Sequence, residues 1–127
     1  MTAIQPELWV DLGATAIEFY QAAFGAQVVH RVGDGEDVVA QLAVGDGAFW
    51  VAATTPGGER LVPSAAGGGR TLLVVDDPDA MHARAVSAGA TIRSPVTDEH
   101  GWRIGRVVDP FGHEWEIGTP TMPWPPR

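Results

Sequence analysis

The stretch DPFGHEWEIG, residues 109–118, gathers side chains that could do chemistry around a single turn. It holds His113, Glu114 and Glu116, and imidazole and carboxylate groups are donors that divalent cations accept. Successive side chains of a strand point to opposite faces, so Glu114 and Glu116 share one face and Trp115 lies on the other. The spacing indicates either one rim of a metal site or a tight hairpin whose last strand carries carboxylates into solvent.

The rest of the chain offers few other reactive groups. It has no cysteine, which excludes disulfides, thiolate nucleophiles and cysteine zinc sites. No two of the four histidines are spaced to present their rings together, and His113 is expected to stabilise the DPFG turn. No serine occupies a nucleophile elbow, and the glycines of AAGGGR precede a strand instead of following one, so a phosphate loop is not predicted.

Length and charge narrow the class of protein. A chain of 127 residues predicts one domain, residues 1–127. The net charge of −8 argues against nucleic acid as a partner, because such a surface repels phosphate. No apolar run approaches the roughly 20 residues of a membrane span, and no secretory signal is recognisable, so a cytoplasmic protein is expected.

Hydrophobic periodicity predicts the same order of elements twice. In the first half we expect Thr15 to cap a helix, with Glu18 at the capping-box spacing, and Gly25 to end it. In the second half Asp79 is expected to cap a helix that ends at Gly89. The strands are predicted at residues 7–12, 26–32, 37–44 and 48–53, and again at 71–77, 90–96, 101–109 and 113–118.

The two halves can be aligned on each other. With an offset of 64 residues AIEFYQAAFGA falls on AMHARAVSAGA, and with an offset of 65 GAFWVA falls on GHEWEI, which pairs Trp50 with Trp115. The fold class predicted is therefore α+β, with two tandem βαβββ modules that form curved mixed sheets. Module 1 spans about 4–54, a linker about 55–69, module 2 about 70–119, and an extended tail 120–127.

FYQAAFGA, the GDG hairpin and GWRIGRVVDPFGHEWEIG together resemble the glyoxalase/bleomycin-resistance/dioxygenase (vicinal oxygen chelate) superfamily, and most closely its PhnB-like branch. The resemblance covers roughly residues 4–119. It implies two modules that close a cup, commonly in a homodimer. The cup holds either a divalent metal for lyase, isomerase or dioxygenase chemistry, or a drug without a metal. One fold hosts many functions, so the resemblance predicts the fold better than the chemistry.

The resemblance implies about four metal ligands, and this chain matches them incompletely. Glu116 occupies the last-strand ligand position, and Gln5 or Glu7 could serve on the first strand. The counterpart of Glu116 in module 1 is Val51, which coordinates nothing. The first-strand counterpart in module 2 is Gly69 or Thr71, with Arg70 between them, and a guanidinium there would repel a cation. We therefore expect no metal or other cofactor. A metal-dependent enzyme that uses Glu116 with Gln5 or Glu7 is the alternative.

Without a metal, a binding cup is the function that the sequence favours. Trp50 and Trp115 are interpreted as core residues under the helices. A half-apolar, half-acidic cup would suit a largely apolar or aromatic small molecule. We expect non-catalytic sequestration of such a compound, such as an antibiotic, in a cup at a dimer interface. The predicted ligand-binding residues are Trp9, Phe49, Val51, His100, Trp102, Glu114 and Glu116.

Overall fold

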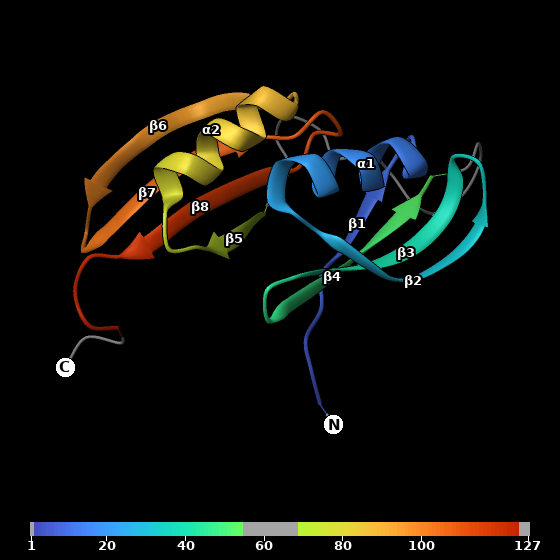
Figure 1. The fold of residues 1–127 in the computed structure, drawn as a ribbon, viewed down its shortest axis with the longest axis horizontal. Helices are drawn as coiled ribbons and strands as arrows, with labels where there is room; N and C mark the ends of the chain where they lie inside the picture. Colours follow the sequence, from blue (N-terminus) through green and yellow to red (C-terminus); the bar gives the residue numbers. More distant parts are fainter. Residues whose placement is uncertain (1, 55–68, 125–127) are drawn as a thin grey trace. The chain divides into compact units, whose positions relative to one another are not determined.

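The computed structural model describes residues 2–54 and 69–124. The chain divides into two compact units, Met1–Ala66 and Gly67–Arg127, and this boundary falls inside the predicted linker. Residues 55–68 of that linker and residues 125–127 of the predicted tail lie outside the described residues. Each unit has the order βαβββ, so the prediction of two tandem modules with mixed sheets is confirmed (Figure 1).

The first unit is a four-stranded mixed sheet with one helix packed on β3 and β4. The strand order is β1-β4-β3-β2, with β1 parallel to β4 and the other neighbours antiparallel. Its elements are β1 (Glu7–Val10), α1 (Gly13–Phe24), β2 (Gln27–Asp34), β3 (Asp37–Val44) and β4 (Gly47–Ala53).

Helix α1 begins earlier than predicted and receives its cap from a distant residue. It starts at Gly13, and the N-cap residue Leu12 makes no side-chain cap. The carboxylate of Glu36, in the turn between β2 and β3, accepts from the backbone N of Thr15 at 2.9 Å and from its Oγ1 at 2.7 Å. The predicted capping box of Thr15 with Glu18 is therefore wrong. Local spacing could not show that the acceptor lies 21 residues along the chain.

The core of the first unit lies between α1 and its sheet. Tyr20 is fully buried, and its ring meets Phe49 edge to face at a centroid distance of 5.2 Å. Phe49 and Val51 are buried on this helix-covered face of β4, whereas Trp50 between them is only half-buried. Burial of side chains such as Phe49 and Val51 stabilises the unit by about 1.5–3 kcal/mol each.

This burial pattern corrects two predictions. Phe49 and Val51 belong to the core and do not line a ligand cup, whereas Trp50 is not a core residue under the helix. The offset of 65 residues placed buried Val51 on Glu116, so that alignment of the strands was wrong by one residue. A shift of one residue exchanges the two faces of a strand. The run Phe49-Trp50-Val51 is apolar throughout, so alternation could not reveal the error.

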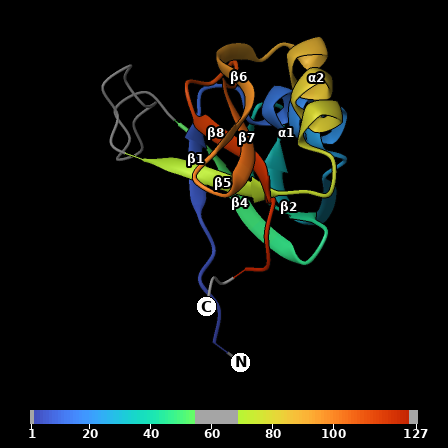
Figure 2. The ribbon, with the colours of Figure 1, turned by 90° about the vertical axis from the view of Figure 1, so that its left-hand side faces the viewer.

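The second unit repeats the architecture of the first. The strand order is β5-β8-β7-β6, with β5 parallel to β8, and α2 packs on β6, β7 and β8 (Figure 2). Its elements are β5 (Arg70–Val74), α2 (Pro78–Ala88), β6 (Thr91–Glu99), β7 (Trp102–Val108) and β8 (Glu114–Pro120). In the described part of the chain, no helix is long and apolar enough to span a membrane.

Helix α2 starts at Pro78, and its cap, Asp77, lies two residues before the predicted cap. The side chain of Asp77 accepts from the backbone N of Ala80 at 3.1 Å, and Pro78 occupies the first turn, where its missing N–H costs nothing. Asp79 is not the cap. Its carboxylate instead pairs with Arg103 of β7, with Nε–Oδ2 at 2.7 Å and Nη2–Oδ1 at 2.8 Å. The predicted end at Gly89 is confirmed, with a positive φ of 124°.

A buried carboxylate closes the turn between β7 and β8. Asp109 is only 4% exposed. Its Oδ1 accepts from the backbone N of Phe111 at 3.0 Å and of His113 at 2.9 Å, and its Oδ2 accepts from Nε1 of Trp115 at 2.9 Å. The side chain of Asp109 thus holds the DPFG turn, to which His113 contributes its backbone amide. Trp115 lies in the core, as predicted, and so does Ile117.

Candidate functional site

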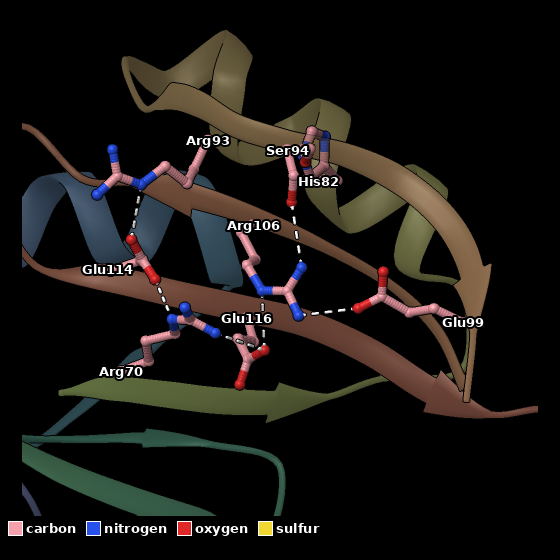
Figure 3. A network of polar contacts seen from close by, with 8 residues as sticks. All are labelled: Arg70, His82, Arg93, Ser94, Glu99, Arg106, Glu114 and Glu116. Atoms are coloured by element: carbon pink, nitrogen blue, oxygen red, sulfur yellow. Dashed lines mark hydrogen bonds and ion pairs between the residues drawn. The ribbon is translucent and has the colours of Figure 1, made fainter. Parts of the chain in front are cut away.

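Each sheet has one face under its helix and an opposite face, which we call the distal face. On the second sheet the distal face carries Glu114 and Glu116, as predicted from strand alternation. Among the described residues, these two belong to a network of three arginines and three glutamates (Figure 3). Its members are Arg70, Arg93, Glu99, Arg106, Glu114 and Glu116.

Glu116 lies between two guanidinium groups. Its Oε2 is 3.0 Å from Nε of Arg106 and 3.3 Å from Nη1 of Arg70. The strand register explains both contacts, because Glu116 pairs with Arg106 on β7 and with Leu72, two residues after Arg70, on β5. The carboxylate predicted as a candidate metal ligand is therefore engaged by two cations of its own unit.

Glu114 is held in the same way by Arg70 and Arg93. It forms an ion pair with Arg70, and its Oε1 accepts from Nε of Arg93 at 2.9 Å. Burial alone would raise the pKa of the Glu114 carboxyl. The hydrogen bond from Arg93 and the charges of both arginines outweigh that effect and hold the pKa below its ordinary value.

Arg106 is the centre of the network. Besides Glu116, it donates from Nη2 to Oε1 of Glu99 at 2.9 Å and from Nη1 to Oγ of Ser94 at 3.4 Å. The hydrogen bond to Glu99, and after it the bond to Glu116, raises the pKa of the guanidinium despite its partial burial. The network balances three positive with three negative charges, so the prediction that this half of the cup is acidic is wrong. The prediction overlooked arginines that reach it from neighbouring strands.

The distal face of the first sheet carries two tryptophans. Trp9 and Trp50 are both half-buried, and the partner of Trp50 in the parallel register is Glu7. Nε1 of Trp9 donates to Oε2 of Glu7 at 2.8 Å, and Nε1 of Trp50 donates to Oε1 of Gln5 at 2.8 Å. The same Gln5 oxygen accepts from Nε2 of Gln41 at 2.9 Å. Both indoles are therefore held in orientation by hydrogen bonds.

The remaining predicted site residues lie in the second unit. Trp102 begins β7 and meets Trp124 edge to face at a centroid distance of 5.5 Å. His100 is exposed in the turn between β6 and β7, with a positive φ of 51°. Neither Trp102 nor His100 belongs to the charge network, and their contact with a ligand stays a prediction.

Comparison with known proteins decides the family. The sequence model of the Glyoxalase/Bleomycin resistance protein/Dioxygenase superfamily matches residues 4–117. The chain belongs to this superfamily. The uncharacterized protein Mb0911c of Mycobacterium bovis is 39% identical over 126 residues, which cover 93% of this chain and 83% of that protein. The PhnB-like branch stays a prediction.

Solved structures share the superfamily fold. TioX from Micromonospora sp. ML1 superposes with a TM-score of 0.74 at 24% identity, covering 94% of this chain and 98% of TioX. The fosfomycin resistance protein FosX from Listeria monocytogenes, in a complex with Mn(II), has a TM-score of 0.70 at 13% identity, covering 98% of this chain and 93% of FosX. At these identities the likeness establishes the fold alone.

The residues of this superfamily member fit a metal centre poorly. Glu116, Gln5 and Glu7 were the possible ligands, and an oxygen of each already accepts hydrogen bonds from nitrogen donors of its own unit. A cation at Glu116 would also lie beside the guanidiniums of Arg70 and Arg106, which repel it. Within residues 2–54 and 69–124, no group of three or more His, Cys, Asp or Glu residues could hold a metal ion.

Two residues on the distal face of the first sheet are not among the site residues predicted from the sequence. Trp50 was assigned to the core, and Gln41 was not considered. The alternation in β3, where Val38, Ala40 and Leu42 are buried, could have placed Gln41 on the distal face. Its register partner Trp50 would then have followed to the same face, because directly paired residues of neighbouring strands share a face.

Proposed function

We propose that the protein is a non-catalytic binding protein for planar, largely apolar small molecules, which it holds against the distal face of the first sheet. The observation that carries the proposal is the pair of oriented indoles, Trp9 and Trp50. Each is half-buried, and each has its only polar atom bonded to an acceptor on the same face.

Oriented indoles suit stacking for a physical reason. A hydrogen bond at Nε1 restricts the rotation of the ring before any ligand arrives, so less side-chain freedom is lost on binding. A well-placed aromatic pair contributes about 0.5–1.5 kcal/mol beyond the burial of its surface. Two residues that approach from adjacent strands β1 and β4 can contribute to the same planar ligand.

The second distal face supports binding more than catalysis. Its carboxylates are neutralised by Arg70, Arg93 and Arg106, so it offers a polar surface with balanced charge. A general base or a metal ligand at Glu116 would first have to give up two guanidinium contacts. These contacts favour binding over the metal-dependent alternative with Glu116 and Gln5 or Glu7.

The biological role that we propose is sequestration of an aromatic antibiotic by a homodimer. The resemblance to drug-binding members of the superfamily supports it. The charge of the second distal face is balanced, so the test panel includes neutral aromatic compounds.

Tryptophan fluorescence tests the location of the ligand. We expect planar aromatic antibiotics or plain polycyclic compounds to quench the emission of the native protein. The effect should be weakened at least severalfold in Trp9→Leu and Trp50→Leu and retained in Trp102→Leu, the matched change in the second unit. If Trp102→Leu alone abolishes quenching, the first sheet is not the site. If no planar compound quenches, the binding proposal is wrong.

Metal analysis tests the competing function. Protein purified without chelator and then titrated with Ni²⁺, Mn²⁺, Fe²⁺ or Zn²⁺ is expected to hold no stoichiometric metal. One equivalent of metal that is lost in Glu116→Gln would overturn the non-catalytic proposal in favour of a metal-dependent enzyme.

A further inference from the structure

Two glutamine amides lie beside Trp50 on the distal face of the first sheet. Oε1 of Gln5 accepts from Nε1 of Trp50 at 2.8 Å and from Nε2 of Gln41 at 2.9 Å. Gln41 is half-buried on β3, directly across from Trp50 on β4. The three side chains therefore form one connected group, and that group lies where the proposed function places the ligand.

The orientation of both amides follows from the chemistry of the indole. An indole N–H can only donate, so the atom of Gln5 that faces Trp50 must be its carbonyl oxygen. That same oxygen faces the end of the Gln41 amide, which must then present its nitrogen, because two carbonyl oxygens would repel each other. The usual ambiguity between oxygen and nitrogen in glutamine side chains is removed at both residues.

After these contacts the two glutamines keep one donor group and one acceptor atom that are not bonded to described residues of the protein. Within the described part of the chain, Nε2 of Gln5 and Oε1 of Gln41 take part in no hydrogen bond with the protein. Gln5 is an exposed residue, and Oε1 of Gln41 is not sealed from solvent. A ligand that stacks on Trp50 thus meets an N–H donor from one glutamine and a C=O acceptor from the other. Unsatisfied polar groups of this kind reject ligands that cannot pair with them when water is displaced.

We propose that this pair recognises planar heterocycles that carry a lactam edge, an inference that rests on the proposed function. The ring stacks on Trp50, the lactam C=O accepts from Nε2 of Gln5, and the lactam N–H donates to Oε1 of Gln41. A lactam supplies the acceptor and the donor on adjacent atoms, in the same plane as the ring. Simple apolar arenes fill the stacking surface but leave both amides unpaired.

Three probes of nearly equal shape separate recognition from stacking. They are 2-quinolone, which has the lactam N–H and C=O, its N-methyl derivative, which lacks the N–H, and quinoline, which lacks the lactam. We expect 2-quinolone to bind about fivefold more tightly than the N-methyl derivative, the size of one neutral hydrogen bond. Titration is followed by ¹H–¹⁵N correlation spectra, in which the side-chain N–H signals of Gln5, Gln41 and Trp50 should shift.

The variant Gln5→Glu tests the donor. A glutamate oxygen still accepts from Trp50 and Gln41, so the local structure is retained, but the free donor becomes an acceptor. The preference for 2-quinolone over quinoline should then disappear. Gln27→Glu, which makes the same change of charge on the exposed strand β2, should keep it.

The outcomes separate the inference from the proposed function. Equal binding of all three probes, or a preference that survives Gln5→Glu, would overturn lactam recognition and leave stacking on the indoles intact. If none of the three binds while larger planar compounds quench tryptophan fluorescence, lactam recognition is likewise overturned and the binding proposal stands. Failure of both sets of compounds overturns both.

Discussion

The carboxylate of Asp109 is a single side chain on which the second unit should depend strongly. It accepts three hydrogen bonds inside the β7–β8 turn, from the backbone N of Phe111 and His113 and from Nε1 of Trp115. This turn sets the register that places Glu116 beside Arg106. The substitution Asp109→Asn keeps the shape of the side chain and exchanges one acceptor oxygen for an NH₂ donor.

The size of the effect follows from the contacts. A hydrogen bond to a charged group contributes about 1.5–3 kcal/mol. Whichever way the asparagine turns, its NH₂ group faces either the indole N–H of Trp115 or the two backbone amides, and at least one bond is lost. The surviving bonds become neutral and weaker. We expect Asp109→Asn to lower the free energy of unfolding by about 2–4 kcal/mol.

Urea unfolding followed by fluorescence and far-UV circular dichroism measures this loss. The control is Asp46→Asn in the exposed β3–β4 turn of the first unit, which should change stability by less than about 0.5 kcal/mol. A double-mutant cycle with Trp115→Phe isolates the bond from Nε1 to the carboxylate, with an expected coupling energy of about 1.5–3 kcal/mol. A loss for Asp109→Asn no larger than that of the control, or no coupling to Trp115, would refute the role assigned to this carboxylate.

Two further predictions concern packing and pH. In Gly105→Ala the new Cβ would lie 2.8 Å from Cδ2 of His82, so the free energy of unfolding measured by chemical denaturation should fall by about 1–3 kcal/mol. In the control Gly47→Ala the nearest atom lies 3.6 Å from the new Cβ, so the free energy of unfolding should hardly change. Hydrogen bonds at the start of α1 lower the pKa of Glu36, so its stabilisation is present above the ordinary pKa of a glutamate and is lost as the pH falls through the lowered value. At neutral pH the midpoint temperature of thermal unfolding should be a few degrees lower in Glu36→Gln than in the native protein, and unchanged in Glu18→Gln. In acid the difference between the two variants should vanish. Equal midpoints for the two variants at neutral pH would show that Glu36 is not the cap.

The order of elements could be predicted from the sequence because it rests on local patterns. Strand alternation, glycine stops such as Gly25 and Gly89, and the turn residues between strands all act over a few positions. The face of β8 was also predictable, because polar Glu114 and Glu116 alternate with apolar Trp115 and Ile117 in the sequence.

The wrong predictions share one physical origin, which is contact between residues far apart in the chain. Glu36 caps a helix that begins 23 positions earlier, at Gly13. The arginines that neutralise Glu116 come from β5 and β7. The face of Trp50 is set by the packing of its neighbour Phe49 against Tyr20, because an all-apolar run gives no sign of which residue turns inward. The candidate site was therefore predicted only in part.

The way in which each helix begins has a consequence for how the two units assemble. Helix α2 carries its own start signal, since Asp77 and Pro78 directly precede or open it. Helix α1 relies on Glu36, so its first turn is complete only after the β2–β3 hairpin has closed. Loop closure must therefore precede full stabilisation of α1, whereas α2 can nucleate from local contacts alone. We therefore expect the two modules, although they share one architecture, to differ in folding order, because only α1 depends on a hairpin for its cap.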